Sequence, residues 1–156
     1  MGDVLIREKE IRQFSDCVQL FLPEDAVVEA DMSGVVPLEP EMASFIHDHY
    51  EYSHIISKKY IKDRIKAGPA FGIMENGKPV GWVMTHEEGT MGILQVLPEY
   101  RRRGLAFKLD CALVNSLRKM GKPCISHIVK GNTASLSVSE KMGFKYSCDV
   151  QWIILE

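Results

Sequence analysis

The sequence predicts a single α+β domain in which helices cover a mixed, mainly antiparallel sheet of about six to seven strands. Several short segments alternate apolar with polar residues, as strands do, while others repeat apolar residues every three to four positions, as helices do. The two kinds of segment follow the order β-α-α-β-β-β-α-β-α-β. A length of 156 residues and a hydrophobic content of 46% suit one soluble domain.

The first 31 residues are the hardest part of the chain to interpret. Five apolar residues there have roughly helical spacing: Ile6, Ile11, Phe14, Val18 and Phe21. They fit one ragged helical face, and residues 26–30 fit a short strand. We predict that residues 1–31 form an N-terminal extension packed on a domain that covers residues 32–156.

The remaining elements are predicted in this order: strand 35–38, helices 40–49 and 57–67, strands 70–74, 80–85 and 90–97, helix 102–120, strand 124–129, helix 132–142 and strand 144–154. Pro40 suits the first turn of a helix, and Gly68 suits a helix end. Asn76-Gly77 is a strong signal for a two-residue hairpin turn between strands.

The second half of the chain has clear boundary signals. Five apolar residues mark the inner face of helix 102–120: Ala106, Leu109, Leu113, Leu117 and Met120. Gly121 ends this helix, Asn132 is a good N-cap for the next one, and Gly143 ends that one. The last strand alternates, with its apolar face running from Phe144 to Ile154.

Charge and composition exclude several classes of protein. The net charge of −2 argues against a nucleic-acid-coating protein, and no apolar run reaches the ~18–20 residues that span a bilayer. The N-terminal residues form no readable signal peptide, so we expect a cytoplasmic protein that binds neither membrane nor nucleic acid. Four widely spaced cysteines without a CxxC pair predict free buried thiols. We expect no metal, because His47 and His49 would point to different faces of a helix.

Residues 98–122 form a basic island, with seven basic and two acidic side chains in a mildly acidic protein. Three consecutive arginines, residues 101–103, stand at a predicted helix start, where positive charge is unfavourable by roughly 0.3–1 kcal/mol per residue. A bound anion would relieve this repulsion, and Gly104 with the small Ala106 would let a phosphate approach the backbone. The alternative is a solvated run of charge without a ligand.

The pattern Arg101-x-x-Gly104-x-Ala106 after a hydrophobic strand resembles the acyl-CoA-binding motif of the GNAT superfamily of N-acyltransferases. A later block, Asn132-x-x-Ser135 followed by Gly143-Phe144, resembles a second motif of that family. Residues 97–101, residues 126–129 and Trp152 resemble the glycine N-acyltransferase-like branch. The resemblance covers residues 34–155 and implies a GNAT-like fold.

The resemblance also implies how an acyl-CoA would bind. The backbone at residues 94–96 would pair with the pantetheine arm, the amides of residues 101–106 would hold the pyrophosphate, and the start of the following helix would fix the arm near the thioester. The cofactor-binding residues implied in this way are Leu94, Gln95, Val96, Arg101, Arg102, Arg103, Gly104, Leu105, Ala106, Asn132 and Ser135. For Asn132, a plain N-cap is an equally good interpretation.

Two catalytic groups of the family are replaced in this chain. Ser139 stands where the resemblance places a tyrosine acid, and Thr90 stands where glycine N-acyltransferases carry a glutamate base. His127 is the predicted replacement base, since an imidazole with a pKa near 6.5 accepts a proton at neutral pH. The alternative is a buried structural histidine. His86, in a turn beside two glutamates, is a further candidate.

The resemblance implies an acceptor pocket walled by the segment after the first helix, here Tyr50, Tyr52 and His54. The predicted function is transfer of an acyl group, most simply acetyl, from acetyl-CoA or another acyl-CoA to a small-molecule amine. Two alternatives stay open: a protein or peptide N-terminal acetyltransferase, and a catalytically inactive CoA-binding sensor. A homodimer is compatible with either enzyme.

Overall fold

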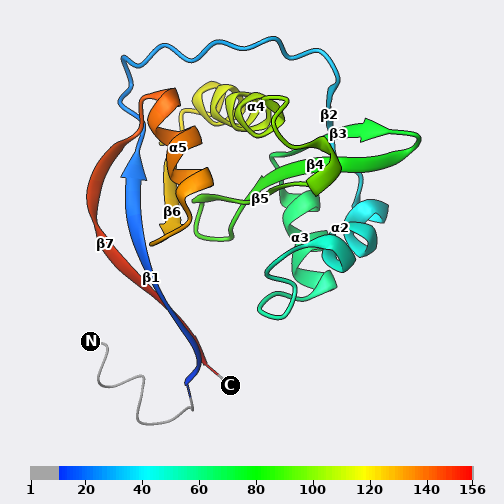
Figure 1. The fold of residues 1–156 in the computed structure, drawn as a ribbon, viewed down its shortest axis with the longest axis horizontal. Coiled ribbons are helices and arrows are strands. Elements are labelled where there is room, and N and C mark those ends of the chain that lie inside the picture. Colours follow the sequence, from blue (N-terminus) through cyan, green and yellow to red (C-terminus); the bar gives the residue numbers. More distant parts are fainter. Residues whose placement is uncertain (1–10, 156) are drawn as a thin grey trace.

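The computed structural model describes residues 11–155, which form one seven-stranded sheet in the order β2-β3-β4-β5-β6-β1-β7 (Figure 1). The strands are β1 (Ile11–Phe21), β2 (Val35–Pro37), β3 (Ala70–Glu75), β4 (Lys78–Thr85), β5 (Met91–Val96), β6 (Ile125–Val129) and β7 (Lys145–Leu155). The helices are α2 (Ala43–His49), α3 (Lys58–Ala67), α4 (Leu105–Lys119) and α5 (Thr133–Met142). The predicted α+β class and the mixed sheet are confirmed.

The sheet has a hydrophobic core on each face. The alternation of side chains along β4 shows this directly, because Val83 packs with α4 while Trp82 and Met84 pack with α2 and α3. All three side chains are fully buried. The helices therefore cover both faces, and Figure 1 shows α4 and α5 on one side and α2 and α3 on the other.

Local sequence signals placed several boundaries well. The Ser57 hydroxyl accepts the backbone N–H of Tyr60, so Ser57 is the N-cap of α3. Asn76 and Gly77, with φ of 53° and 76°, make the predicted hairpin turn between β3 and β4. By contrast, helix 102–120 was predicted to start too early. Arg102 and Gly104 adopt φ of 65° and 72°, a left-handed backbone that no α-helix contains, so α4 begins at Leu105.

The helical interpretation of the apolar residues near the N-terminus is wrong for residues 11–21, and Ile6 lies outside the described residues. Residues 11–21 form β1, which lies between β6 and β7 and pairs antiparallel with both. Its partner strands lie more than a hundred residues away in sequence, so no local sequence pattern predicts this pairing. The division of the chain at residue 31 stays a prediction.

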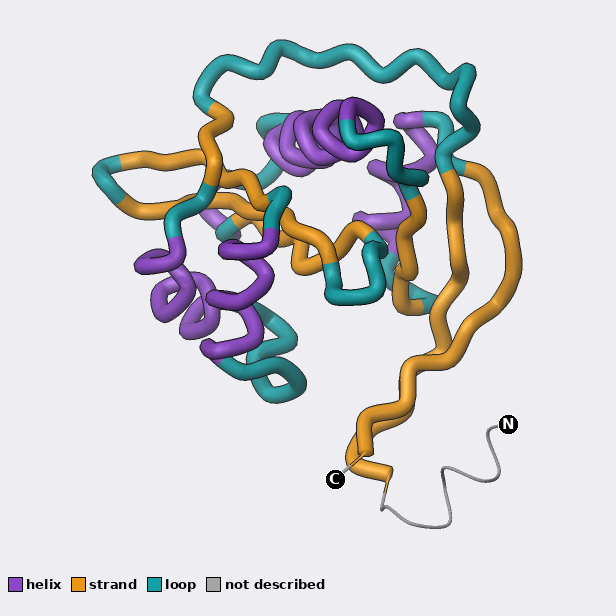
Figure 2. The backbone as a smooth tube through the Cα atoms, turned by 180° about the vertical axis from the view of Figure 1, so that it is seen from behind, coloured by secondary structure: helices purple, strands orange, loops and turns teal. Residues whose placement is uncertain are grey.

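Residues 22–34 form an extended strap instead of the predicted strand at 26–30. The strap crosses over α4 on its way from β1 to β2, as both ribbon views show (Figure 1, Figure 2). The Arg118 guanidinium of α4 holds it by donating to the carbonyl oxygens of Ala26 and Pro23 at 2.7 and 2.9 Å.

The predicted apolar face of the last strand is only partly buried. Phe144 lies in the core, but Tyr146 is 61% exposed and Cys148 is exposed as well. The pairing between β1 and β7 shifts register between Gln19 and Leu20, and β7 is an edge strand, so helices do not cover this stretch. The prediction of a buried thiol is therefore wrong for Cys148, whereas the other three cysteines are free and buried.

Candidate active site

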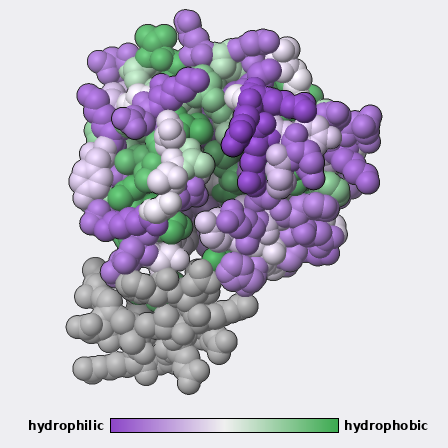
Figure 3. Space-filling model, in the orientation of Figure 1, coloured by the Kyte–Doolittle hydropathy of each residue, from purple (hydrophilic) through white to green (hydrophobic). Residues whose placement is uncertain are grey.

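The strands β5 and β6 run parallel and pair at one position only, Met91 with Ser126. A cavity of about 710 Å³ opens where the two strands separate. Its walls come mainly from β5, β6, α5, the segment after α2 and the turn between β4 and β5, with two residues of β1 and single residues of α3, α4 and β7. In the space-filling view, apolar side chains are visible between hydrophilic ones on this face of the molecule (Figure 3).

A β-bulge shapes the β5 wall of this cavity. On β4, Trp82 and Met84 pair with Gln95 and Gly92, so two residues of β5 stand opposite one residue of β4. One of those two, Ile93, adopts a φ of 51°, a left-handed value that is rare for a β-branched residue. A bulge of this kind leaves one residue without a cross-strand partner, and here Ile93 and Leu94 both line the cavity.

Beyond β5, residues 101–104 form the turn that precedes α4. The helix begins without a side-chain cap, and the N–H groups of its first turn have no partner within the helix. No heavy atom lies within 4 Å of the position that a Cβ of Gly104 would take, so this turn is open to a ligand. The turn has the geometry of an anion site at a helix N-terminus.

The three arginines of this turn differ in what they contact. Arg101 donates from Nε to the carbonyl oxygen of Val96 at 2.9 Å, which braces the end of β5. Arg103 lies over the ring of Tyr100, 5.3 Å from its centroid. Arg102 is exposed on its left-handed backbone. Arg101 and Arg103 therefore stabilise the turn through their contacts, and all three arginines give it positive charge.

The predicted cofactor residues fall into two groups. Leu94, Asn132 and Ser135 line the cavity, and the Asn132 side chain accepts the Ser135 N–H at 3.2 Å as the N-cap of α5. Gln95 and Val96 do not line it. The Gln95 amide instead clamps the segment after α2, accepting the Glu51 N–H at 2.8 Å and donating to the carbonyl of His49.

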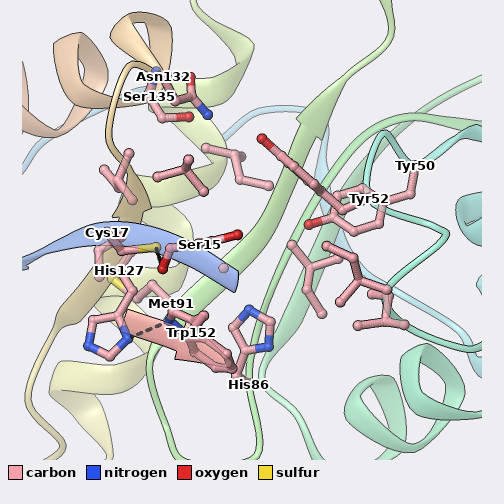
Figure 4. A pocket seen from close by; sticks show the side chains of 18 of the residues that line it. Ser15, Cys17, Tyr50, Tyr52, His86, Met91, His127, Asn132, Ser135 and Trp152 are labelled. Atoms are coloured by element: carbon pink, nitrogen blue, oxygen red, sulfur yellow. Dashed lines mark hydrogen bonds between the residues drawn. The ribbon is translucent and has the colours of Figure 1, made fainter. Parts of the chain in front are cut away.

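The residues of the predicted acceptor wall come together in the same cavity. Tyr50, Tyr52 and His54 all line it, together with Tyr60 of α3. Burial raises the pKa of Tyr50 well above its ordinary value, so its hydroxyl keeps its proton. Figure 4 shows Tyr50 and Tyr52 on a side wall, between an end with Asn132 and an end with His86.

His127 lines the cavity with both ring nitrogens engaged. The Trp152 indole N–H donates to Nδ1 at 3.1 Å, and an indole nitrogen can only donate, so Nδ1 carries no proton. Nε2 must then hold the proton, which it donates to the side-chain oxygen of Gln19 at 2.8 Å. Burial lowers the pKa of His127 and keeps the ring neutral. Its predicted role as base stays a prediction, although these bonds leave it no free lone pair.

His86, the further candidate named from the sequence, also lines the cavity. It follows β4, and its Nδ1 lies 2.9 Å from the Tyr60 hydroxyl. Its Nε2 lies over Gly92, only 2.5 Å from where a Cβ would stand. Burial lowers the pKa of this imidazole below 6.5. The sequence contains Gly92, whose missing side chain leaves room for the His86 ring. That the two residues face each other becomes known only from the fold.

Asp110 is a cavity residue that the sequence analysis did not single out, because its place in α4 is an ordinary helix position. It is 7% exposed, lines the cavity and forms no ion pair or hydrogen bond through its carboxyl group with the described residues. Burial raises its pKa to about 7. Ser139 of α5, the predicted acid, is 4% exposed and lines the same cavity.

The turn between β4 and β5 contributes two carboxylates. Glu87 and Glu88 line the cavity and are exposed at its edge. Thr90, which stands where a glutamate was expected, is buried outside the lining and donates its hydroxyl to Glu88 at 2.7 Å. Among residues 11–155, no three His, Cys, Asp or Glu side chains form a group that could hold a metal ion. In the same residues, no helix has the length and hydropathy needed to cross a membrane.

Comparison with solved structures identifies relatives of this fold. A Drosophila protein superposes with a TM-score of 0.82 at 24% identity, covering 92% of this chain and 52% of that one. A putative GNAT-family acetyltransferase from Novosphingobium aromaticivorans superposes with a TM-score of 0.74 at 16% identity, covering 94% of this chain and 66% of that one.

Curated relatives match over part of their length. The mouse glycine N-acyltransferase-like protein Keg1 is 34% identical over 77 residues, 49% of this chain and 26% of that protein. The bovine glycine N-phenylacetyltransferase is 24% identical over 117 residues, 74% of this chain and 40% of that protein. The chain thus spans less than half the length of these relatives. The FR47-like protein family model matches residues 70–153, more than half of the chain. The chain therefore belongs to the FR47-like family, within the GNAT superfamily.

Proposed function

We propose that this protein transfers an acyl group, most simply acetyl, from an acyl-CoA to the amine of a small acceptor. The observation that carries the proposal is the separation of β5 from β6 after a single pairing, next to an uncapped helix start. The edge of β5 opened in this way leads directly to the turn before α4. The glycine N-acyltransferases among the curated relatives support the same reaction class.

Three parts of the chain would hold an acyl-CoA. The open edge of β5 would pair with the amides of an extended pantetheine arm, as an added strand does. The N–H groups at residues 102–106 would bind the pyrophosphate, because the turn is open at Gly104 and carries positive charge. Asn132 and Ser135 would contact the arm from the start of α5, where both face the cavity.

When bound, an acyl-CoA supplies a thioester carbon, at which a neutral amine forms the C–N bond while the C–S bond breaks. The amine gives up one proton in this reaction, and the leaving thiolate gains one. His86 would accept the amine proton at Nε2, with Nδ1–H donating to the Tyr60 oxygen. That oxygen also lies 3.4 Å from the Glu87 N–H, and a hydroxyl accepts two bonds. The backbone N–H groups of the bulge at Ile93 and Leu94 would face the developing oxyanion.

Asp110 and Ser139 are candidates for returning a proton to the thiolate. Asp110 is the better acid, because its buried carboxyl has a pKa of about 7 whereas a serine hydroxyl titrates far outside the physiological range. The catalytic role of Ser139 remains a prediction. So do the cytoplasmic location and the homodimer.

The test is acceptor-dependent release of CoA thiol from acetyl-CoA, with the acylated product identified by mass spectrometry. We expect thiol and acylated amine in equal amounts. Binding of acetyl-CoA without release for any amine would instead support the sensor alternative. A cavity of about 710 Å³ walled by aromatic side chains favours a small acceptor over a protein N-terminus.

A further inference from the structure

The ionisable side chains that line the cavity are carboxyl groups, tyrosines, histidines and one cysteine. Glu87, Glu88 and Asp110 are its carboxyl groups, and no lysine or arginine belongs to its lining within the described part of the chain. His86 and His127 are neutral at pH 7, since burial lowers the pKa of both.

The Arg64 guanidinium acts electrostatically on His86, but it is not part of the cavity lining and is hydrogen-bonded within the protein. Arg64 of α3 donates from Nε to the Thr85 carbonyl at 2.7 Å and from Nη2 to the Thr85 hydroxyl at 2.9 Å. His47 uses its Nε2 within the protein as well, 3.0 and 2.9 Å from the carbonyl oxygens of Ser53 and Ile56. The described walls therefore offer no lysine or arginine side chain to an anionic acceptor.

This charge pattern bears on the acceptor. An amino acid carries a carboxylate one carbon from its amine, so both groups would enter the cavity together. Burying a carboxylate without a cationic partner is unfavourable, and the acidic edge adds repulsion. A simple ammonium ion is attracted by the same edge and loses its proton inside.

The acceptor end is also aromatic. Tyr50 and Tyr52 contact edge to face with centroids 5.7 Å apart, and the rings of His86 and Trp152 lie 5.4 Å apart. Figure 4 shows these rings around one space. Surfaces of this kind favour an aromatic or apolar body, and a cation is attracted to ring faces as it enters.

From these two features we infer that the acceptor is a primary amine with an aromatic or apolar body and no carboxylate, its nitrogen lying between His86 and the Glu87-Glu88 turn. The inference rests on the proposed function and narrows its substrate class. It separates this chain from relatives named for glycine, which is an amino acid with a carboxylate.

The experiment compares acceptors that differ only in the carboxylate, with acetyl-CoA as donor: tyramine against tyrosine, and tryptamine against tryptophan, with glycine as a further acceptor. We expect kcat/KM for each amine to exceed that of its amino acid by at least about 100-fold, equivalent to roughly 2.7 kcal/mol. Glycine should react more slowly than either amine. Equal rates within a pair, or a preference for glycine, would overturn the inference while leaving the proposed acyl transfer intact.

A variant of the cavity lining tests directly whether the missing cationic side chain causes the preference for amines over amino acids. Tyr52→Arg places a cation in the lining and should raise kcat/KM for tyrosine relative to tyramine by about tenfold or more. The matched control is Val27→Arg, on the strap and 78% exposed, which should leave the ratio unchanged. A rise in the Tm of each variant on addition of acetyl-CoA checks that both variants fold and bind the donor. If acetyl-CoA binds but no acceptor releases thiol, the proposed function and this inference both fail.

Discussion

His86 and His127 face one cavity, yet their hydrogen bonds give them different chemistry. His127 is fixed between an indole donor and an amide acceptor, so protonating it at Nδ1 would break the bond to Trp152. His86 is held through one nitrogen by Tyr60, and its other nitrogen lies over a glycine. The bond at Nδ1 orients the His86 imidazole and leaves Nε2 available to accept a proton.

Substitution separates the two histidines. His86→Gln should lower acceptor-dependent thiol release by ~10²–10⁴-fold, because a general base contributes about that much, with acetyl-CoA affinity unchanged. Gly92→Ala should act similarly, since its Cβ would displace the His86 ring. His127→Gln should instead change the rate less than tenfold and lower thermal stability. The opposite ranking of the two histidines would contradict the assignment.

The pH dependence of the rate follows from the direction of the His86 pKa. Only the neutral imidazole accepts a proton, and burial lowers this pKa below 6.5. The pH–rate profile should therefore show a rising limb below pH 6.5, where the rate increases as His86 loses its proton. Rates measured at saturating acceptor between pH 5 and 8 test this, and His86→Gln should abolish the limb. A limb unchanged in that variant would point to another base.

Asp110 links the cavity to stability. Its pKa is raised by burial from 3.8 to about 7, so between these values the native protein holds a proton that the unfolded chain has released. Stability conferred by the protonated form is thus lost as pH rises through this window. Asp110→Asn should raise the free energy of unfolding at pH 8 more than at pH 4, by up to about 4 kcal/mol for three pKa units. Asp25→Asn, on the exposed strap, should show no such difference in denaturant titrations.

At the scale of elements, the start and end of α4 provide a matched test of the anion site. Gly104 and Gly121 have nearly equal φ, 72° and 69°, and open space where a Cβ would be. Saturating acetyl-CoA, at 100 times its Kd, should stabilise the protein by about 2.7 kcal/mol, or roughly 5–10 °C in Tm. Gly104→Glu should abolish this rise because it adds bulk and negative charge to the turn, whereas Gly121→Glu should keep it. Equal losses in both variants would mean that strain alone explains the effect.

The edge strand β7 gives another test of an element. Cys148 is exposed, whereas Cys17, Cys111 and Cys124 are buried. In the native protein one thiol should react rapidly with a thiol reagent, and the other three only on unfolding. Cys148→Ser should remove the fast phase. Any fast-reacting thiol in that variant would show that the β1–β7 ribbon does not protect the core as described.

At the scale of the molecule, local signals predicted most of the fold and one end of the site. The hairpin at Asn76-Gly77, the cap at Asn132 and the turn at Gly104 are each encoded within a few residues. The place of β1 between β6 and β7 is not, because both its neighbours follow more than a hundred residues later. The same limit applies to Asp110 and His86, whose roles depend on which strands separate and which glycine faces them.

Hydrogen–deuterium exchange reports where an acyl-CoA binds, which we expect to be along β5 and at the start of α4. Adding saturating acetyl-CoA should slow amide exchange at residues 92–96 and 102–107, where backbone N–H groups would bond the ligand. The strap at residues 22–34 should show little change, and Gly104→Glu should lose the protection at both segments. Protection absent from both segments, despite a measured rise in Tm, would mean that acetyl-CoA binds elsewhere on the protein.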